Sequence, residues 1–462
     1  MTKPRQRILA VVLAAGQGTR LRSSLPKVLH PAAGRPMLDW VLRAARSAGC
    51  EDIAVVIGHG AETVRQAFDA EEITWVLQEE QKGTGHALAQ AESVMCEPGI
   101  MLVLSGDVPL VSATTLGQLV RAAQEGWASM AVADLDNPGS LGRVLTAADG
   151  SLAGIVEASD ASPQELAIGR VNAGLYALPT PDIFDFLRAL EPDNAKGELY
   201  LTDALNAAAR EGKPIKLVDL TDPAESWGVN DRADLGRAHR ALSHRHAELL
   251  MQAGVSILDP ASTTIESTVN VGRDTVVHPG VSLLGDSSIG EGCTIEQGVW
   301  LRDVSVGDGT RIAPYSVLEG AEIASGCQIG PFARLRPGAV VASRAKVGNF
   351  VEIKNSELGE GAKVNHLAYI GDAAVGEGSN IGAGVVTCNY DGHKKSPTRI
   401  GRNVFIGSDT MLIAPVEIGD EAMTAAGSVV SKDVPEGALA VERSTQRNIA
   451  DWARRFRRRK GK

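Results

Sequence analysis

The chain of 462 residues is 44% hydrophobic and only 4% aromatic, and its formal net charge is −10. The length allows two or three domains with cores of their own, and the acidic balance argues against a general nucleic-acid-binding protein, which needs a basic surface. Five cysteines without close pairs favour a reducing compartment, and no stretch is long and apolar enough to cross a membrane, so we expect a cytoplasmic protein without membrane insertion.

Residues 1–230 alternate strand-like and helix-like segments, which is typical of an α/β domain with an open, mostly parallel, Rossmann-like sheet. We predict strands at 8–14, 52–57, 74–77 and 100–104, and helices at 38–49 and 84–95. Ligands of such sheets bind at the carboxyl ends of the strands, so the loops after Leu13, Leu77 and Leu104 are where a site is expected.

The loop after the first strand combines small residues with positive charge. Small residues at 14–18 let backbone N–H groups approach a phosphate, and Arg20 and Lys27 supply cations. The loop is not a dinucleotide-binding fingerprint, because Leu21 stands where a third glycine is needed, and it lacks the lysine and hydroxyl residue of a P-loop. Taken alone, its Gly-x-Gly is more typical of an ordinary strand-to-helix turn.

The string Leu13–Arg20, followed by Pro26 and Lys27, resembles the signature of sugar-1-phosphate nucleotidylyltransferases, and segment 78–86 is similar to the part of that family that reads the base. One departure is Gln17, where many relatives have lysine. The resemblance implies a UTP site that consists of Leu13, Ala14, Ala15, Gly16, Gly18, Thr19, Lys27, Gln78, Gly83 and Thr84.

Asp107 follows a strand that is predicted to be buried, and such a carboxylate can hold Mg²⁺, which prefers oxygen ligands, or can equally cap a turn. In the family that this chain resembles, the aspartate binds Mg²⁺ with a distant asparagine, a place that Asn230 matches. The resemblance also implies that N-acetylglucosamine-1-phosphate is bound by Gly142, Glu157, Asn172, Tyr200, Thr202 and Asn230.

The reaction of that family brings anions together, because an oxygen of a sugar-1-phosphate attacks the α-phosphorus of a nucleoside triphosphate. We therefore expect catalysis by positioning and by charge neutralisation through Mg²⁺ and Lys27 or Arg20, without a general base.

Residues 231–254 favour one linking helix, and residues 255–440 form a repeat. From Ile265 to Val430 an aliphatic residue returns at about every sixth position, which is the mark of a parallel β-helix with three hexapeptides per coil. The residue four positions after each aliphatic one is usually small, which suits a narrow triangular prism, as at Cys293, Ala333, Ala339, Ala345, Ala362, Ala368 and Ala374.

Three features interrupt the uniform repeat. Arg336 and Lys354 lie three hexads apart and should stack on adjacent coils, where like charges about 4.8 Å apart repel by about 3 kcal/mol at an effective dielectric of about 20. Either the side chains splay apart, or the pair binds a phosphate. His366 should stack between Asn349 and Ala383, as an ordinary surface residue or as a general base. Thirteen residues from Thr387 replace one hexad, which indicates a functional loop or a tolerated insertion.

Segments 365–372, 380–384 and 388–392, together with Arg336 and Lys354, resemble the acetyltransferase half of the bifunctional bacterial enzyme family that makes UDP-N-acetylglucosamine. The resemblance covers nearly the whole chain. It implies a left-handed β-helix, assembly as a homotrimer through it, and His366 as the general base. It also implies a glucosamine-1-phosphate site of Arg336, Lys354, Tyr369 and Asn380, and acetyl-CoA contacts at Ala383, Asn389, Tyr390, Ser408, Ala426 and Arg443.

The predicted function is therefore acetylation of glucosamine-1-phosphate by acetyl-CoA in residues 255–440, followed by uridylyl transfer from UTP in residues 1–230, with residues 441–462 as a C-terminal tail. Such an enzyme supplies the synthesis of peptidoglycan and lipopolysaccharide. One alternative is a sugar-1-phosphate nucleotidylyltransferase with a purely structural β-helix. Another is a regulatory subunit with decayed sites, against which the joint presence of Asp107, Asn230, Lys27 and His366 argues.

Overall fold

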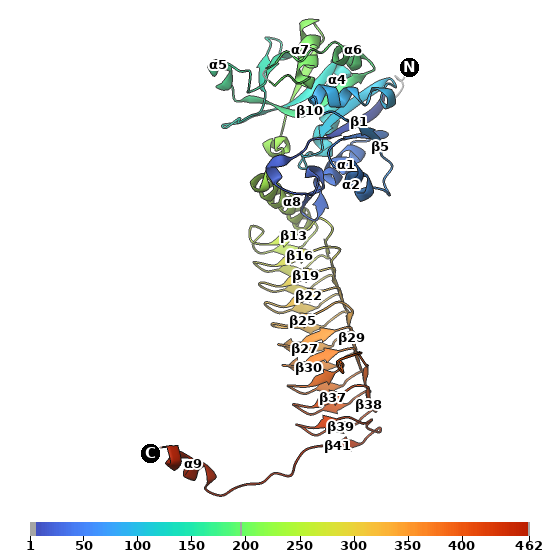
Figure 1. Cartoon of the computed structure of the whole chain (residues 1–462), viewed down its shortest axis with the longest axis vertical. Coiled ribbons are helices and arrows are strands. Elements are labelled where there is room, and N and C mark those ends of the chain that lie inside the picture. The colour runs from blue at the N-terminus through green and yellow to red at the C-terminus, as the bar shows by residue number, and fades with distance from the viewer. Residues whose placement is uncertain (1–5, 195, 461–462) are drawn as a thin grey trace. The chain divides into compact units, whose positions relative to one another are not determined.

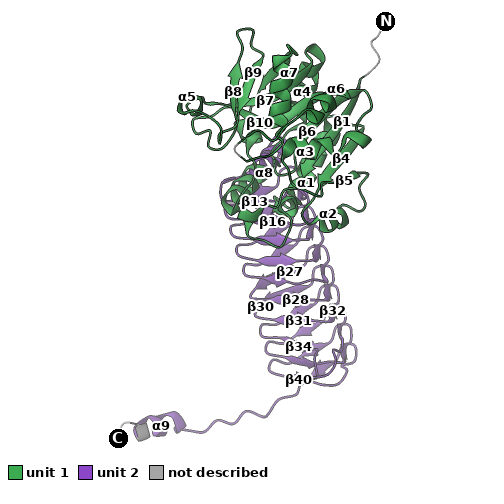
Figure 2. Ribbon diagram, turned by 45° about the horizontal axis from the view of Figure 1, so that its top comes forward, with its two compact units in different colours: residues 1–243 green, residues 244–462 purple. Residues whose placement is uncertain are grey.

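The computed structural model describes residues 6–194 and 196–460 (Figure 1). The chain divides into two compact units, residues 1–243 and 244–462 (Figure 2). The division falls within helix α8 (Arg232–Gln252). Each unit has hydrophobic clusters of its own.

The first unit is built on a mixed sheet in the order β11-β7-β10-β6-β1-β4-β5, in which β1 pairs in parallel with β4 and β6, and β10 is antiparallel to β6 and β7. The sheet confirms the predicted Rossmann-like fold. Its strands are β1 (Arg7–Ala14), β4 (Asp52–Ile57), β5 (Thr74–Leu77), β6 (Gly99–Ser105), β7 (Ala128–Asp134), β8 (Arg143–Thr146), β9 (Leu152–Val156), β10 (Arg170–Thr180) and β11 (Ile215–Asp219), and a hairpin is formed by β2 (Pro31–Ala32) and β3 (Arg35–Pro36).

The helices of this unit cover both faces of the sheet. The α-helices are α1 (Met37–Ser47), α2 (Ala61–Ala67), α3 (Thr84–Ala89), α4 (Ala113–Glu125), α5 (Pro163–Leu166), α6 (Asp182–Arg188) and α7 (Leu201–Arg210), and the 3-10 turns are Thr19–Leu21, Lys27–Leu29, Glu92–Val94 and Pro223–Ser226. The helix predicted at 84–95 is shorter than expected. The Ala91 N–H donates to Leu88 O at 3.0 Å, an i to i−3 bond, and the chain continues as a 3-10 turn.

Strand β1 shows why the sheet has two cores. Its residues alternate between the faces, so that Leu9 and Val11 pack into one cluster and Ala10 and Val12 into the other. A strand that is apolar on both faces is expected at the centre of a parallel sheet that is covered by helices on both sides. Burial of this strand fixes the position of the loop that follows it.

The second unit is a left-handed β-helix whose short parallel strands form three faces, seen as stacked rungs in Figure 1. The first face holds β12 (Ser256–Ile257), β15 (Val276–Val277), β18 (Thr294–Ile295), β21 (Arg311–Ile312), β24 (Gln328–Ile329), β27 (Lys346–Asn349), β30 (Lys363–His366), β33 (Asn380–Ile381), β36 (Phe405–Ile406), β39 (Met423–Thr424) and β41 (Leu439–Ala440). The second face holds β13 (Thr264–Ile265), β16 (Ser282–Leu284), β19 (Trp300–Arg302), β22 (Val317–Glu319), β25 (Arg334–Leu335), β28 (Glu352–Lys354), β31 (Tyr369–Gly371), β34 (Val386–Cys388), β37 (Met411–Ile413) and β40 (Val429–Val430). The third face holds β14 (Asn270–Val271), β17 (Ser288–Ile289), β20 (Ser305–Val306), β23 (Ala321–Ile323), β26 (Ala339–Val341), β29 (Ser356–Leu358), β32 (Ala373–Val375), β35 (Thr398–Ile400) and β38 (Val416–Ile418).

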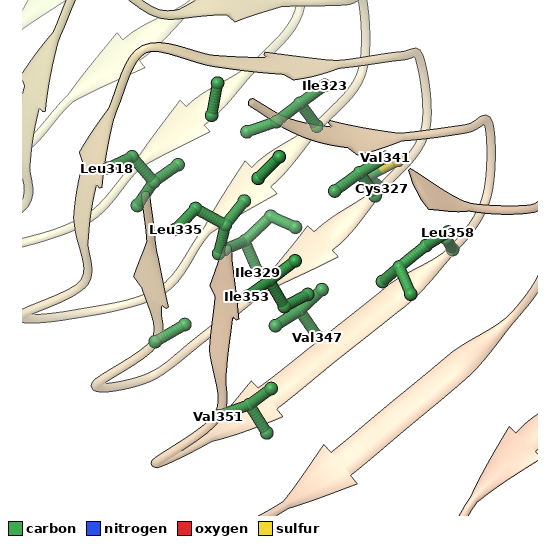
Figure 3. Packing of buried hydrophobic residues seen from close by; sticks show 14 of the residues in the cluster. Leu318, Ile323, Cys327, Ile329, Leu335, Val341, Val347, Val351, Ile353 and Leu358 are labelled. Carbon is green, nitrogen blue, oxygen red and sulfur yellow. The ribbon is translucent and has the colours of Figure 1, made fainter. Parts of the chain in front are cut away.

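The interior of the prism is filled by the predicted six-residue repeat. Aliphatic side chains such as Leu335, Val347 and Ile353 point inward in Figure 3 and are at most 1% exposed. Strands β12 to β37 each pair with the strand three further along the chain, as Leu335 pairs with Ile353, so three hexads make one coil.

The expectation for Ala374 is wrong, because this residue is exposed and its neighbour Ala373 is buried. Val375 follows Ile370 by five positions instead of six, so the inward position between them moves back by one residue. After β34 the chain leaves the prism and returns at β35. The last helix is α9 (Trp452–Lys460).

Candidate active sites

The first candidate site lies at the carboxyl ends of β1 and β6, where two cavities of about 480 and 310 Å³ adjoin. Both are lined by Leu13, Thr84, Ser105 and Asp107. This edge is where a parallel sheet is expected to bind ligands.

Four predicted residues from distant parts of the chain meet beside these cavities. The Lys27 ammonium forms an ion pair with the Asp107 carboxylate and donates to Asn230 Oδ1 at 3.2 Å. Arg20 donates to the same oxygen at 2.8 Å. The Asp107 carbonyl accepts from the Val229 N–H at 2.9 Å, which holds the segment before Asn230 against the end of β6.

The glycines of the neighbouring loops allow close approach. Gly18 has φ +62°, and a Cβ there would lie 2.6 Å from Cβ of Lys27. Gly83 has φ +107°, and a Cβ there would lie 2.5 Å from the Leu199 carbonyl oxygen. A side chain at either position would therefore displace the lysine or the backbone that borders the site.

Asp107 and Asn230 present two oxygen atoms to one point, because Lys27 Nζ contacts both. Across the described residues, no group of three or more His, Cys, Asp or Glu side chains is arranged to hold a metal ion. A pair of oxygen donors nevertheless fits a hard divalent cation that takes its other ligands from water and substrate phosphates. The donor set therefore fits the predicted metal.

The smaller cavity is lined by nine of the ten residues predicted to bind UTP. These nine are Leu13, Ala14, Ala15, Gly16, Gly18, Lys27, Gln78, Gly83 and Thr84. Thr19 is exposed and does not line either cavity. The amide of Gln78 contacts His86 Nδ1 at 2.9 Å.

The larger cavity is lined by five of the six residues predicted to bind N-acetylglucosamine-1-phosphate, namely Gly142, Glu157, Asn172, Thr202 and Asn230. Tyr200 instead lines a separate cavity of about 200 Å³ on which Glu157 also borders. Burial raises the pKa of Glu157, and the Thr202 hydroxyl, which donates to its Oε1 at 2.9 Å, opposes that rise. Asn172 donates to the Tyr176 hydroxyl at 2.6 Å.

The second candidate site is a column of residues at one corner of the prism. Val347, Val364, Ile381, Ile406 and Thr424 pair in register along the first face. The residue two positions after each of them therefore lies on the coil next to its predecessor. This column consists of Asn349, His366, Ala383, Ser408 and Ala426.

His366 is exposed, and its Nδ1 lies 2.7 Å from Asn349 Oδ1. An amide oxygen only accepts hydrogen bonds, so Nδ1 carries the proton and Nε2 of the neutral ring has a lone pair. At the other end of the column, Arg443 Nη1 donates to Ala426 O at 2.9 Å. The register thus places His366 in line with three residues predicted to contact acetyl-CoA.

The cations predicted to bind phosphate lie on the second face, and Arg336 is paired with the Glu352 carboxylate at 3.0 Å. Arg336 and Lys354 therefore do not form a bare pair of like charges. The neighbouring side chain of Lys395 lowers the pKa of Lys354 most, and the charge of Arg336 lowers it less. Sequence reasoning missed Lys395, although the extruded loop that carries it was recognised.

Other predicted residues surround the same part of the prism. The Tyr369 hydroxyl lies over Gly371, where a Cβ would be 2.4 Å away. Asn389 donates to the Asp372 carboxylate, and the hydroxyl of the exposed Tyr390 donates to Gly392 O at 2.7 Å. Asn380 begins β33 on the first face, three residues before Ala383, and pairs in register with Lys363 rather than with His366.

Comparisons with known proteins match the two parts of the chain to two different families. Residues 10–191 match the MobA-like NTP transferase domain, and residues 397–432 match the bacterial transferase hexapeptide family. The bifunctional protein GlmU of Pelobacter propionicus is 46% identical over 456 residues, which are 98% of this chain and 99% of that protein. The chain belongs to the GlmU family.

Other members of the GlmU family are similar to this chain over nearly its whole length. The GlmU protein of Alkalilimnicola ehrlichii is 48% identical over 449 residues and 97% of both chains, and that of Azotobacter vinelandii is 47% identical over 444 residues. Among solved structures, UDP-glucose pyrophosphorylase complexed with UDP-glucose covers 51% of this chain and 98% of that chain, at 22% identity and a TM-score of 0.44.

Proposed function

We propose that the two candidate sites carry out the two reactions of the GlmU family. Residues 255–440 transfer an acetyl group from acetyl-CoA to glucosamine-1-phosphate. Residues 1–230 then join the product to UMP from UTP, which releases pyrophosphate and forms UDP-N-acetylglucosamine. The observation that supports the second assignment most is the meeting of Arg20, Lys27, Asp107 and Asn230 where two cavities adjoin.

The two cavities suit the two substrates of uridylyl transfer. UTP occupies the 310 Å³ cavity, and N-acetylglucosamine-1-phosphate the 480 Å³ cavity. The phosphates of both then meet beside Asp107, which both cavities share. Lys27 and Arg20 lie where negative charge accumulates as the sugar phosphate attacks the α-phosphorus, and they neutralise it.

The GlmU family uses a divalent metal, and we assign it as Mg²⁺, held by Asp107 and Asn230. It would supply further neutralisation of the phosphates. Lys27, which pairs with Asp107 in the structure, is within reach of the phosphates and would contact a phosphate oxygen when Asp107 holds the metal. In the larger cavity, Glu157, Asn172 and Thr202 offer polar groups to the sugar hydroxyls and the acetamido group. Tyr200 supports Glu157 from the adjoining cavity.

For acetyl transfer, His366 Nε2 removes a proton from the amine as the amine attacks the thioester carbonyl. The carbon–sulfur bond then breaks, and the departing CoA sulfur takes up the proton. Asn349 holds the Nδ1 proton and so keeps this tautomer. The thioester lies beside His366, and the rest of acetyl-CoA runs past Ala383, Ser408 and Ala426 towards Arg443. Asn389 and Tyr390 of the extruded loop complete this contact.

The phosphate of glucosamine-1-phosphate binds to Arg336 and Lys354, with Lys395 as a third cation, and Tyr369 and Asn380 contact the same substrate. His366 is exposed on a corner of the prism, so a single chain leaves the reacting atoms open to water. We propose that a homotrimer, assembled through the β-helix in the cytoplasm, closes the site.

Two variants test whether the β-helix is catalytic or only structural. We expect His366→Ala to lower the rate of acetylation by at least about a hundredfold, because a general base contributes that much, with uridylyl transfer near normal. Asp107→Asn should abolish most uridylyl transfer and raise the Mg²⁺ concentration needed for half-maximal rate. Unchanged acetylation in His366→Ala would favour a scaffold, and an unchanged Mg²⁺ titration would exclude Asp107 as the metal ligand.

A further inference from the structure

The C-terminal tail is not used by either proposed reaction beyond Arg443. It leaves the prism after β41, and no strand or helix forms between Val441 and Asp451 (Figure 1). Each side chain described from 441 to 458 is exposed. The tail therefore consists of a segment of about ten residues without helix or strand, followed by the short helix α9.

The charge of the tail is opposite to that of the rest of the chain. Residues 441–462 contain nine Lys or Arg and two acidic residues, a net charge of +7, so the other 440 residues carry −17. Arg454, Arg455, Arg457 and Arg458 lie on α9 and are exposed. Charge segregated in this way attracts an anionic surface to the tail, while the remainder of the chain is repelled.

Apolar side chains lie just before the helix and on it. Ile449 lies three residues before α9, where its carbonyl accepts from the Trp452 N–H at 3.3 Å, and Trp452 and Phe456, four residues apart, share one side of the helix. They are 60%, 53% and 44% exposed, respectively, and the rings of Trp452 and Phe456 stack with centroids 4.9 Å apart. A basic helix with an aromatic stripe has the composition of helices that lie in the interface of a membrane.

We propose that α9 binds the surface of an anionic lipid bilayer. The side chains of Ile449, Trp452 and Phe456 enter the boundary between head groups and acyl chains, and the arginines remain at the phosphates. Within residues 6–194 and 196–460 no helix is long and apolar enough to cross a membrane, so this contact lies on the bilayer and does not span it.

Lipid fits these features better than nucleic acid. The exposed apolar side chains include the aliphatic Ile449, which has no use in stacking on bases. The Trp452 and Phe456 rings lie at 10° to one another and cover one face of each other, so less ring surface is left for a base.

The test compares the full chain with one that ends at Asp451, by sedimentation with vesicles. Vesicles of phosphatidylcholine with about 30% phosphatidylglycerol should bind the full chain, with at least tenfold weaker binding when NaCl rises from about 0.05 to 0.5 M. We expect no binding to pure phosphatidylcholine, and none by the shortened chain. Trp452→Ala with Phe456→Ala should weaken binding at unchanged charge, and replacement of the four arginines by glutamine should abolish it.

Both half-reactions are measured on the same samples and should be unchanged, which keeps this inference separate from the proposed function. The proposal is overturned if the shortened chain binds anionic vesicles as well as the full chain, or if the double alanine variant binds unchanged. Absence of vesicle binding together with tail-dependent binding of duplex DNA also overturns it. The proposal is also overturned if the full chain does not bind vesicles and the shortened chain loses acetylation. That result would make the tail part of the acetyl-CoA site.

Discussion

As the proposed general base, His366 must turn its free nitrogen towards the amine, and the bond from Nδ1 to Asn349 holds the ring in one orientation. We expect Asn349→Leu to lower kcat for acetylation by about 10- to 100-fold, because the ring then turns and changes tautomer. Asn349→Asp keeps an acceptor in place and should retain most of the activity. Equal rates for the two variants in an acetyl transfer assay would exclude this role.

Lys395 matters because it lies against Lys354, whose pKa it lowers. Lys354 therefore loses its proton at lower pH than an ordinary lysine, and KM for glucosamine-1-phosphate should rise with pH from that lower value onward. In Lys395→Met, one phosphate contact is lost and KM increases by about tenfold. The pKa of Lys354 returns upward, so the alkaline rise in KM should move to higher pH.

The matched control is Lys394→Met, in the same loop and of the same charge. Its pH profile should coincide with that of the unaltered chain. A profile that is the same for both lysine variants would show that Lys395 does not act through Lys354.

Single residues also show what the sequence could and could not predict about the sites. The positions of residues that follow a recognisable strand or hexad, such as Asp107 and His366, could be predicted because spacing fixes them in the fold. Lys395 was missed because the loop that carries it has no period, so its return to Lys354 depends on the folded path of the loop. Glu352 was missed because neutralisation of Arg336 depends on side-chain direction, which register alone does not give.

At the scale of elements, the loop between β5 and α3 depends on Gly83. Gly83→Ala puts a Cβ 2.5 Å from the Leu199 carbonyl at a positive φ, so the loop must shift. We expect destabilisation by about 1 kcal/mol or more and a higher KM for UTP. Thermal unfolding and initial rates measure the two effects.

A second alanine variant gives the contrast. Gly117 lies inside α4, where a Cβ would meet only the end of Arg121 at 3.6 Å. Gly117→Ala should stabilise the chain by about 0.5–1 kcal/mol and leave KM for UTP unchanged. If neither alanine variant changed KM for UTP, the close approach at Gly83 would have no role in the site.

The elements themselves were largely predictable, for two different reasons. In the first unit, strands buried on both faces give continuous apolar runs, and the structure has them within a residue or two of the expected bounds. In the second, inward side chains must recur with each hexad. Where a repeat has only five residues, as from Ile370 to Val375, the error at Ala374 shows that the inward position depends on strand register and not on counting forward.

At the scale of the whole molecule, the proposed sites use separate residues: each residue assigned to uridylyl transfer belongs to unit 1, and each assigned to acetyl transfer belongs to unit 2. The two units also have distinct hydrophobic clusters. A lesion in one site should therefore leave the other reaction intact, with the intermediate free to leave one chain and enter another.

This independence predicts complementation. Asp107→Asn and His366→Ala chains, purified separately, should each fail to convert glucosamine-1-phosphate, acetyl-CoA and UTP to UDP-N-acetylglucosamine. Mixed, they should form the product after a lag, during which free N-acetylglucosamine-1-phosphate accumulates. The lag should shorten as the Asp107→Asn chain, which retains acetylation, is increased. Added N-acetylglucosamine-1-phosphate should remove the lag and restore product formation by the His366→Ala chain alone. If the mixture stayed inactive while each chain kept its remaining half-reaction, the intermediate would have to pass within one chain or assembly, and the two sites would not be independent.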